Sequence, residues 1–431
     1  MADVDERLRA HLARVVGTPA PIGWEDRVSR RILGADGHRR HAWVTQVVAA
    51  TALIAVAVGV FFGLRASRQT AAVKPTPTPV TTSAPSPTAS VTPAAAPFFD
   101  RIRMFTPQTG WALTDQGVLR TTDGWVHWVN VGPPGTSHLV GDVQFLTDAA
   151  AWVVAGNGAY APQTSTIFHT TDGGATWARF SVSDPSGVGP GQVDFVDATH
   201  GWLFVSYGAA AGSMGGAVYR TVDGGAQWTE VEKTVGIQDA PGSLGFGCDK
   251  AGVSFINTTT GWATGSCAGG GPFFAVTHDA GRTWSPQSFS IPAGFSGDGG
   301  VTTSLPVFFS DRFGYFILGG NQTVAYTTTD GGTSWVPHRL PAGGWSQPLG
   351  AISFSSLTDG WMISGDGTLI YRTNDGGQHW TSFRPAPLLT GPQGLYPIDA
   401  THAITVLNPS GSQNFITATT DGGRTWRQIE P

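Results

Sequence analysis

The sequence predicts an all-β protein built as a seven-bladed β-propeller, with a membrane-anchoring region before it. A turn of the form Thr-x-Asp-Gly-Gly-x-x-Trp, or a close variant, occurs seven times between Thr121 and Trp426, and its tryptophans are 45 to 56 residues apart. That period matches one four-stranded blade. The 59 glycines and 16 tryptophans, with only 13% charged residues, are typical of a chain of tight turns and bulky packing residues.

Each copy of this turn has the residues of a self-contained hairpin clip. The Asp carboxylate can accept hydrogen bonds from the backbone of its own turn, and the glycines adopt positive φ without steric cost. Copy one has Trp125 in place of the second Gly and copy four has Ala280 in place of the first, so these two turns are expected to differ in detail. The Asp residues of the seven copies are Asp123, Asp172, Asp223, Asp279, Asp330, Asp375 and Asp421, and their Trp residues are Trp128, Trp177, Trp228, Trp284, Trp335, Trp380 and Trp426.

A second element precedes most copies: an aromatic residue, a polar turn and then Gly-Trp. It occurs at 105–111, 195–202, 255–262 and 354–361, with looser versions in the other three copies. Twelve of the 16 tryptophans therefore occupy repeat positions. We interpret them as core residues, since a large ring at the start of each strand is suited to packing between sheets.

The turn resembles the Asp box of bacterial sialidases, sortilin-type receptors and xyloglucan hydrolases. Together with the Gly-Trp element it resembles still more the photosystem II stability/assembly-factor-like family of extracytoplasmic propellers. The resemblance covers 98–431. It implies that the Asp box joins the third and fourth strands of a blade and that Gly-Trp begins the second, so both turns lie on one face, the bottom.

The opposite, top face is expected to carry the variable connections, which are 156–165, 207–216, 233–252, 287–305 and 337–350. Functional residues concentrate in such loops. The candidate ligand contacts there are Tyr160, Tyr207, Phe295, Asp298 and Trp345. The competing interpretation is that each of these side chains packs its own loop.

The region before the propeller divides into three segments. Ala42 to Leu64 is 23 residues without a charge, which favours a transmembrane helix over a cleaved signal peptide. Residues 65–97 form a Pro/Thr/Ser-rich linker without residues for a core. Residues 1–41 suggest two short amphipathic helices, either a solvated tail or a docking site for a cytoplasmic partner.

The basic residues that flank the span set its orientation. Five arginines lie between Arg27 and Arg40, against three basic residues between Arg65 and Lys74, which favours the N-terminus inside. The propeller is then extracytoplasmic, attached to the cytoplasmic membrane. Cys248 and Cys267 would form a disulfide in an oxidising compartment and remain two small buried residues in a reducing one.

Charge argues against nucleic-acid binding. From Phe98 onward there are 14 Lys and Arg against 24 Asp and Glu, and 14 − 24 = −10. A field of that sign repels phosphate backbones, and no basic cluster offsets it.

Catalytic and metal-binding constellations are not evident. A sialidase needs converging arginines and a Tyr paired with Glu, whereas Arg120, Arg220 and Arg372 are equivalent repeat positions. The three Glu residues of the propeller, Glu230, Glu232 and Glu430, are not beside a Tyr in sequence. A carboxylate pair that includes Asp298 stays open, because sequence gives no distance. Six of the eight propeller histidines occupy repeat positions in different blades, so we predict no metal site and no cofactor.

The sequence therefore predicts a non-catalytic scaffold, similar to the photosystem II assembly factors, that holds an envelope protein, peptide or glycan on its top face and at the entrance of its central pore. One alternative is a cell-envelope glycoside hydrolase of the sialidase kind. The other is a transmembrane sensor that signals through the N-terminal helices.

Overall fold

The structure is a computed structural model that describes residues 97–136, 140–156, 163–184, 186–187, 191–210, 212–235, 240–297, 300–341, 352–409 and 414–429. They lie in a unit that runs from Thr92 to Pro431. In this part of the chain, no helix has the length and hydrophobicity that a membrane crossing needs. The predicted N-terminal helices, the span and the linker up to residue 96 lie outside the described residues, as do Tyr160, Asp298 and Trp345.

The described residues form seven separate antiparallel sheets, each built from consecutive strands. The sheets are numbered as blades 1 to 7 in chain order. The strands of blades 1 to 4 are β1 (Phe99–Met104), β2 (Gly110–Thr114), β3 (Gly117–Thr121), β4 (Val129–Asn130), β5 (Val140–Phe145), β6 (Ala151–Ala155), β7 (Gln163–Thr170), β8 (Ala178–Asp184), β9 (Gln192–Phe195), β10 (Gly201–Ala210), β11 (Ser213–Thr221), β12 (Thr229–Thr234), β13 (Cys248–Phe255), β14 (Gly261–Cys267), β15 (Gly271–Thr277) and β16 (Ser285–Pro286).

Blade 5 differs from the others because its first strand is divided in two. Pro306 lies at the break and has no N–H to donate to a neighbouring strand. Both halves, β17 and β18, pair with β19. The strands of blades 5 to 7 are β17 (Thr302–Thr303), β18 (Val307–Phe308), β19 (Gly314–Gly319), β20 (Thr323–Thr328), β21 (Val336–Arg339), β22 (Ile352–Phe354), β23 (Gly360–Ile363), β24 (Ile370–Thr373), β25 (Thr381–Phe383), β26 (Pro392–Pro397), β27 (Ala403–Leu407), β28 (Phe415–Thr419) and β29 (Arg427–Ile429).

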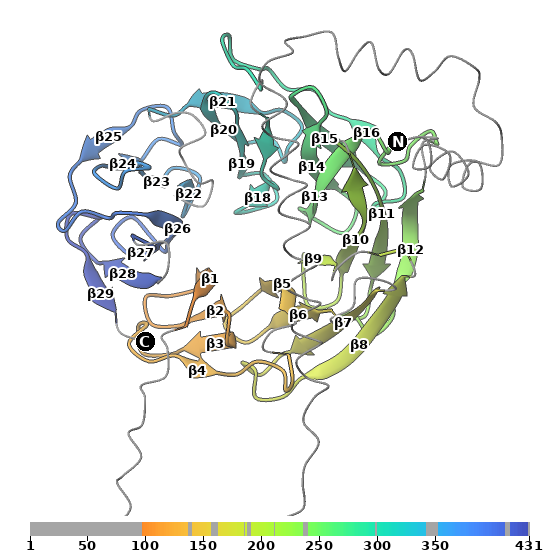
Figure 1. Cartoon of the computed structure of the whole chain (residues 1–431), viewed down its shortest axis with the longest axis horizontal. Coiled ribbons are helices and arrows are strands. Elements are labelled where there is room, and N and C mark those ends of the chain that lie inside the picture. The colour runs from red at the N-terminus through yellow and green to blue at the C-terminus, as the bar shows by residue number, and fades with distance from the viewer. Residues whose placement is uncertain are drawn as a thin grey trace, which may run out of the picture. The chain divides into compact units, whose positions relative to one another are not determined.

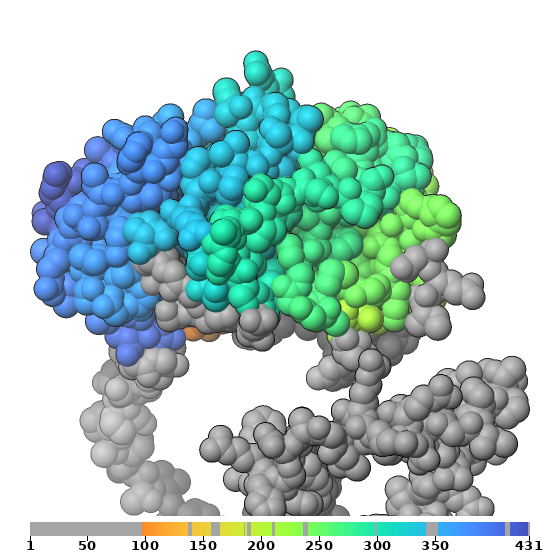
Figure 2. Space-filling model, turned by 90° about the horizontal axis from the view of Figure 1, so that it is seen from above, coloured from red at the N-terminus to blue at the C-terminus, as the bar shows by residue number. Residues whose placement is uncertain are grey.

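The seven sheets stand around a ring, and the first strand of each blade lines the centre (Figure 1). The space-filling view shows blades 4 to 7 packed side by side along the rim (Figure 2). The predicted all-β fold with seven blades is confirmed. Each Asp box joins the third and fourth strands of its blade, and each Gly-Trp begins the second strand.

The hydrophobic core lies between the blades. Each of seven buried clusters combines side chains from two neighbouring blades, so every blade contact has its own core. In the joint of blades 3 and 4, the Trp202 ring stacks on Phe255 with a centroid distance of 3.5 Å. In the joint of blades 2 and 3, Trp152 stacks on Phe195 at 3.9 Å. The Trp of one blade thus packs on the aromatic residue of the next, as large rings at sheet interfaces do.

The tryptophans of the Gly-Trp element are the deepest residues of these joints. Their exposed fraction is at most 1%, which confirms their predicted core role: Trp111, Trp152, Trp202, Trp262 and Trp361. The Asp-box tryptophans are less uniform. Three of them are buried as predicted: Trp284, Trp335 and Trp426.

The other four Asp-box tryptophans are only partly buried, which corrects the uniform core role expected from the sequence. They pack against the edge of a joint cluster: Trp128, Trp177, Trp228 and Trp380. All seven Asp-box tryptophans stand just before the fourth and outermost strand of their blade. Trp284 and Trp426 are in addition bonded to a connecting segment, because their backbone N–H groups donate to the Gly242 and Ala386 carbonyls. The four partly buried rings meet the core along one edge, as Trp228 meets Phe195 edge-on at 6.0 Å.

The ring closes by side-chain packing rather than by a shared strand. Blade 1 consists of β1 to β4 and blade 7 of β26 to β29, so each blade is complete from one chain segment. A buried cluster that includes Phe99 and Ile102 of blade 1 with Ile404 and Ile416 of blade 7 fills the joint between them. The Tyr396 hydroxyl donates to the Asp100 carbonyl across the same joint, at 3.0 Å.

The two faces of the ring follow from strand direction. The Asp boxes and the turns between first and second strands share the bottom face, since antiparallel strands alternate their ends. The remaining connections lead to the top face, where β1 begins at Phe99 and β29 ends at Ile429. Both ends of the described chain therefore lie at the face with the longer connections.

Candidate functional site

The Asp-box side chains are hydrogen-bonded within their own turns. In copy two, the Asp172 carboxylate accepts bonds from the Thr170 hydroxyl at 2.7 Å and from the Thr176 backbone N–H at 2.9 Å. The Thr176 hydroxyl donates to its second oxygen at 2.6 Å. These bonds lower the pKa of Asp172 to about 2, the Thr176 hydroxyl contributing most. All seven Asp residues accept such bonds from the Thr two residues before them.

The Asp-box tryptophans fasten the same turns through their indole N–H groups. In four copies this group donates to the carbonyl of the glycine three residues earlier, at 2.8 to 3.1 Å, from Trp228, Trp284, Trp380 and Trp426. Trp177 instead donates to the Val131 carbonyl of blade 1 at 2.8 Å. These indole groups are committed to the turns and joints, so the rings do not form a binding platform.

Copies one and four keep the same backbone in spite of their substitutions. Trp125 has φ of 62° and Ala280 has φ of 65°, both in the left-handed region that glycine occupies in the other copies. A side chain in that region costs about 1–2 kcal/mol. Ala280 is nevertheless buried, and its carbonyl accepts the Trp202 indole N–H at 2.9 Å. Packing in the blade joint thus holds the strained conformation.

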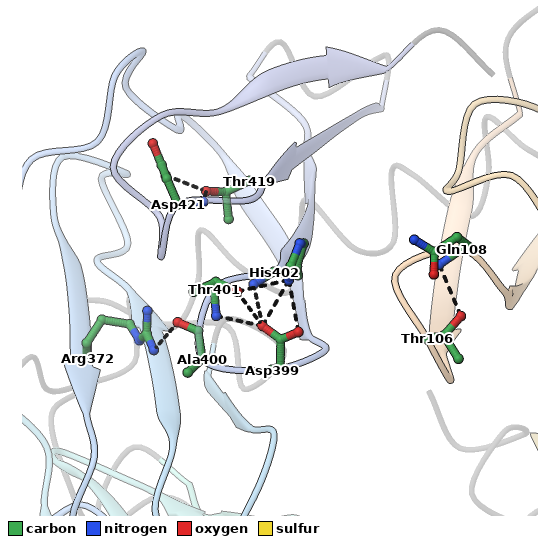
Figure 3. A network of polar contacts seen from close by, with 9 residues as sticks. All are labelled: Thr106, Gln108, Arg372, Asp399, Ala400, Thr401, His402, Thr419 and Asp421. Carbon is green, nitrogen blue, oxygen red and sulfur yellow. Dashed lines mark hydrogen bonds and ion pairs between the residues drawn. The ribbon is translucent and has the colours of Figure 1, made fainter.

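Each of the three repeat arginines bonds to the next blade, lies over the Gly-Trp tryptophan of its own blade, or does both. Arg372 of β24 donates to the carbonyls of Ala400 and Gly422 in blade 7, at 2.8 and 3.0 Å, beside the Asp399 to His402 turn (Figure 3). Its guanidinium also lies 3.5 Å from the Trp361 ring. Arg120 donates to the Asp148 carbonyl of blade 2, and Arg220 lies over Trp202. Arg120 and Arg372 connect neighbouring blades, and the three arginines do not converge on one point.

The repeat histidines are also distributed around the ring. Four of them contact the Asp of their own turn, as His402 does with Asp399 at 2.9 Å (Figure 3). His169 instead stacks on Trp152 at 4.2 Å, and burial lowers its pKa. Among the described residues, no group of three or more His, Cys, Asp or Glu side chains could hold a metal ion.

Tyr207, a candidate ligand contact, lies in a polar cluster between blades 2 and 3. Its hydroxyl donates to Asp184 at 2.8 Å, and the Tyr219 hydroxyl donates to the same oxygen at 2.8 Å. Tyr219 also lies 3.3 Å from Glu230, so the fold brings together a Tyr and a Glu that are eleven residues apart in sequence. Lys233 completes the cluster, 3.2 Å from Glu230.

The electrostatics of this cluster oppose a role as a nucleophile. Burial, with Asp184 next, raises the pKa of Tyr219 far above its ordinary value, whereas a nucleophilic phenolate needs a lowered pKa. Burial also raises the pKa of Asp184, but the hydrogen bonds from Tyr207, Ser186 and Tyr219 outweigh it, and the net pKa is lowered. The cluster is a satisfied joint between two blades.

Phe295, the other described candidate, packs partly buried against the core between blades 4 and 5. Its loop is fixed to the β19–β20 turn, where the side chains of Asn321 and Gln322 both donate to the Gly294 carbonyl at 2.9 Å. The geometry therefore gives Phe295 a packing role. Tyr160, Asp298 and Trp345 lie outside the described residues.

The connection between blades 3 and 4 is held by buried polar groups and a disulfide. Cys248 and Cys267 are bonded, with S–S 1.98 Å, at directly paired positions of β13 and β14. The buried Lys250 ammonium donates to the carbonyls of Met214 and Cys248 at 2.9 and 2.7 Å, and also to that of Gly245. Buried Glu232 accepts the Leu244 N–H at 3.2 Å, and burial raises its pKa. This part of the top face is a rigid support.

The inner strands carry a set of side chains that the sequence analysis missed. In blades 2 and 3, polar residues one and three positions before the strand-ending Phe accept backbone N–H groups of the next blade. Asp142 accepts from Val193 at 2.8 Å and Gln144 accepts from Phe195. The same two positions in blade 3 are Gln192 and Asp194, which accept from Val253 at 2.8 Å and Phe255 at 2.7 Å. We call these four side chains the inner belt.

The inner belt satisfies the free edges of β9 and β13. An edge strand exposes N–H groups that need acceptors, and here the preceding blade supplies them. The sequence does contain a pattern that could have predicted the inner belt: Asp-Val-Gln-Phe at 142–145 and Gln-Val-Asp-Phe at 192–195. In both segments polar residues alternate with apolar ones. Such alternation indicates two differently used faces of a strand.

Asp142 and Asp194 are the carboxylates that the ring brings together on its inner side. Burial raises the pKa of Asp142, although Arg101 donates to it at 2.9 Å. Burial raises the pKa of Asp194 to about 7, the Phe255 N–H opposes this, and the charge of Asp142 adds to it. Both oxygens of Asp142 have donors, and Asp194 receives Phe255 at 2.7 Å and the Gln144 amide at 3.4 Å. The pair is committed to the blade joints.

Comparison with known proteins agrees with this class of fold. Residues 301–430 match the sequence family described as photosynthesis system II assembly factor YCF48. The curated proteins contain no match to the chain. The chain is therefore an Asp-box repeat β-propeller that resembles the YCF48 assembly factors, with the sequence match confined to its last three blades.

Solved structures that are similar to this chain include two of YCF48 and one of an enzyme. A structure described as YCF48 bound to D1 peptide is 18% identical, covering 79% of this chain and 95% of that chain, with a TM-score of 0.45. YCF48 from Cyanidioschyzon merolae is 19% identical, covering 79% and 98%, with a TM-score of 0.47. The GH74 xyloglucanase from Xanthomonas campestris is 18% identical, covering 78% and 55%, with a TM-score of 0.52. Likeness at this identity shows a shared propeller fold alone.

Proposed function

We propose that this protein is a non-catalytic binding or assembly scaffold, similar to the photosystem II assembly factors, that holds a protein or peptide of the cell envelope on its top face. The observation that carries the proposal is what the clustered polar side chains bond to. The inner belt, the Tyr207 cluster and two of the repeat arginines, Arg120 and Arg372, serve joints between blades. The match of 301–430 to an assembly-factor family supports the same role.

The described part of the top face at blades 3 to 5 has the properties of a preformed platform. The tips of neighbouring hairpins touch, since a Cβ at Gly212 would lie 2.7 Å from Ala268 and one at Gly270 would lie 2.5 Å from the Gly297 carbonyl. The disulfide and the buried charges of Glu232 and Lys250 fix the connection beside them. A rigid surface with little ordering cost on binding favours recognition of a partner.

We further propose that the propeller works outside the cytoplasmic membrane, with Ala42 to Leu64 as its anchor and the N-terminus inside. The pairing of Cys248 with Cys267 supports an oxidising compartment, because disulfides persist there and are rare in the cytosol.

Site-specific photo-crosslinking tests the binding face. A benzophenone side chain is placed at Ala268, an exposed hairpin tip of the top face, and in the control at Val222, which is 57% exposed in a bottom-face turn. The full chain is irradiated in membranes of its own cells. We expect an adduct of defined mass from position 268 that excess unlabelled protein competes away, and none from position 222.

A second top-face position, Asp366 in the β23–β24 turn, covers a partner that binds on the other side of the ring. Equal adducts from both faces, or none from positions 268 and 366, would contradict the proposal. Sugar release from xyloglucan by the wild type, lost on replacing Asp142 and Asp194 together by Asn, would show catalysis instead.

A further inference from the structure

The two arginines of β1 occupy inner-belt positions where the next two blades have acceptors. The strand pairing makes Arg103 equivalent to Gln144 and Asp194, because these three residues pair with Trp111, Trp152 and Trp202 at the start of their second strands. In the same way, Arg101 is equivalent to Asp142 and Gln192. Guanidinium groups donate only, so neither arginine can accept a backbone N–H of blade 2.

The joint between blades 1 and 2 therefore has more hydrogen-bond donors than acceptors. The N–H groups of Phe195 and Phe255 are accepted by Gln144 and Asp194. Phe145 holds the same position in β5, and its N–H points away from β6 because the next N–H, that of Leu146, bonds the Ala150 carbonyl. Among the described residues, no side chain accepts the Phe145 N–H.

Arg103 itself is a cation without a counter-charge. It makes no hydrogen bond or ion pair with any described residue, and its guanidinium lies 5.0 Å from the centroid of the Phe105 ring. The side chain is open to solvent, yet desolvation by the surrounding protein lowers its pKa. Both properties fit a recess on the inner side of the ring.

Arg101 adds further donors beside it. Its Nη1 donates to the Asp142 carboxylate at 2.9 Å and to the Val143 carbonyl at 2.7 Å, which leaves Nη2 and Nε without partners in the described part of the chain. Its side chain is 47% exposed. Residues two apart on a strand lie about 7 Å from each other on the same side, so an anion at Arg103 is also within the field of Arg101.

We propose that Arg103, the Phe145 N–H and the neighbouring Arg101 form a binding site for an oxyanion, a carboxylate or a phosphate, on the inner side of blades 1 and 2. The anion takes the place that the Gln144 and Asp194 oxygens fill in the following joints. Planar guanidinium groups bind both kinds of oxyanion in bidentate fashion. The site is separate from the top-face platform, and it stands even if the partner binds elsewhere.

Equilibrium dialysis of the full chain in mild detergent against labelled inorganic phosphate, at constant ionic strength, measures this site directly. We expect saturable binding of one phosphate per chain and a loss of about tenfold or more in affinity for Arg103→Gln, the loss expected when a charge-assisted pair is removed. Arg103→Lys keeps the charge without the fork and should bind with intermediate affinity. Arg179→Gln removes an exposed arginine of β8 and is the matched control, with unchanged binding expected.

Competition distinguishes the source of the oxyanion. Displacement of phosphate by N-acetylglycine but not by N-acetylglycinamide indicates a protein carboxylate, and displacement by neither indicates a phosphate-type ligand. Either result supports the site. The absence of saturable phosphate binding to the wild type overturns the proposal, as does equal affinity of the wild type and a folded Arg103→Gln or Arg103→Lys variant, with folding checked by near-ultraviolet circular dichroism.

Discussion

Replacing Asp194 by Asn isolates the electrostatic cost of the inner belt. The amide oxygen of Asn has the same reach and accepts the Phe255 N–H as the carboxylate does at 2.7 Å. The substitution therefore keeps the joint between blades 3 and 4, removes the charge, and gives up only the long contact from the Gln144 amide at 3.4 Å. That charge is unfavourable in the folded protein, because burial, with the negative charge of Asp142, raises the pKa of Asp194 to about 7.

The sign and size of the effect follow from linkage. A carboxyl group whose pKa is higher in the folded state contributes its full stability below the unfolded pKa, near 4, and loses it as pH rises through the folded pKa, near 7. The free energy of unfolding of the wild type is then lowered by about 1.5 kcal/mol at pH 5 and by about 4 kcal/mol at pH 8 relative to a neutral side chain. Asp194→Asn should recover these amounts, with no further gain above about pH 8.

Urea denaturation of the full chain at pH 5, 6, 7 and 8, followed by tryptophan fluorescence, measures the difference. Trp202, which is buried in the joint beside Asp194, reports on the folded state. Asp311→Asn removes an exposed carboxylate in a bottom-face turn and is the control for the loss of a charge that lies outside the blade joints. A difference between Asp194→Asn and wild type that is constant with pH, or negative at pH 8, would refute the reasoning.

Three further changes test the turns, the disulfide and a candidate contact by the same denaturation assay. Gly332→Ala and Gly377→Ala both place a side chain at positive φ, costing about 1–2 kcal/mol. At position 332 the new Cβ would also lie 2.2 Å from the Trp262 ring, whereas at position 377 the nearest atom is 3.6 Å away. Gly332→Ala should therefore lower the free energy of unfolding by about 1–3 kcal/mol more than Gly377→Ala does. Equal losses of stability in the two variants would contradict this. Cys248→Ser opens a cross-link of sequence separation 19 and should lower stability by about 3 kcal/mol under non-reducing conditions, an effect that disappears when both proteins are reduced. Tyr207→Phe should cost about 1 kcal/mol but leave crosslinking from the top face unchanged, whereas a loss of the adduct would make Tyr207 a ligand contact.

Local chemistry made the propeller predictable from sequence. The hydrogen bonds of each Asp-box carboxylate join residues at most four positions apart, as from Thr121 to Asp123 and from His127 to Asp123. Residues that act within so short a stretch form a motif that is visible in the sequence, and the number of its copies gives the number of blades. At Trp125 and Ala280 the rest of the turn still favours the glycine conformation, and at Ala280 packing in the blade joint holds it as well.

Contacts between strands were not predictable in the same way. Tyr219 and Glu230 pair directly across β11 and β12, but a register shift between Val218 and Tyr219 decides that pairing. A shift of one residue would turn the two side chains to opposite faces of the sheet. The absence of a Glu beside a Tyr in sequence was therefore no test of their distance, and what argues against catalysis is the raised pKa of the tyrosine.

The way in which the ring closes follows from the order of the strands and the Asp boxes. In the described part of the chain, three strands precede the first Asp box and one follows the last, so each blade is complete from its own segment. Closure then depends on the surface that blades 1 and 7 bury, and the Tyr396 hydroxyl and the Asn414 amide donate across the joint to the Asp100 and Phe99 carbonyls. Because Tyr396 holds the inner-belt position of blade 7, the same strand position that connects blades 2 to 4 also connects the last blade to the first.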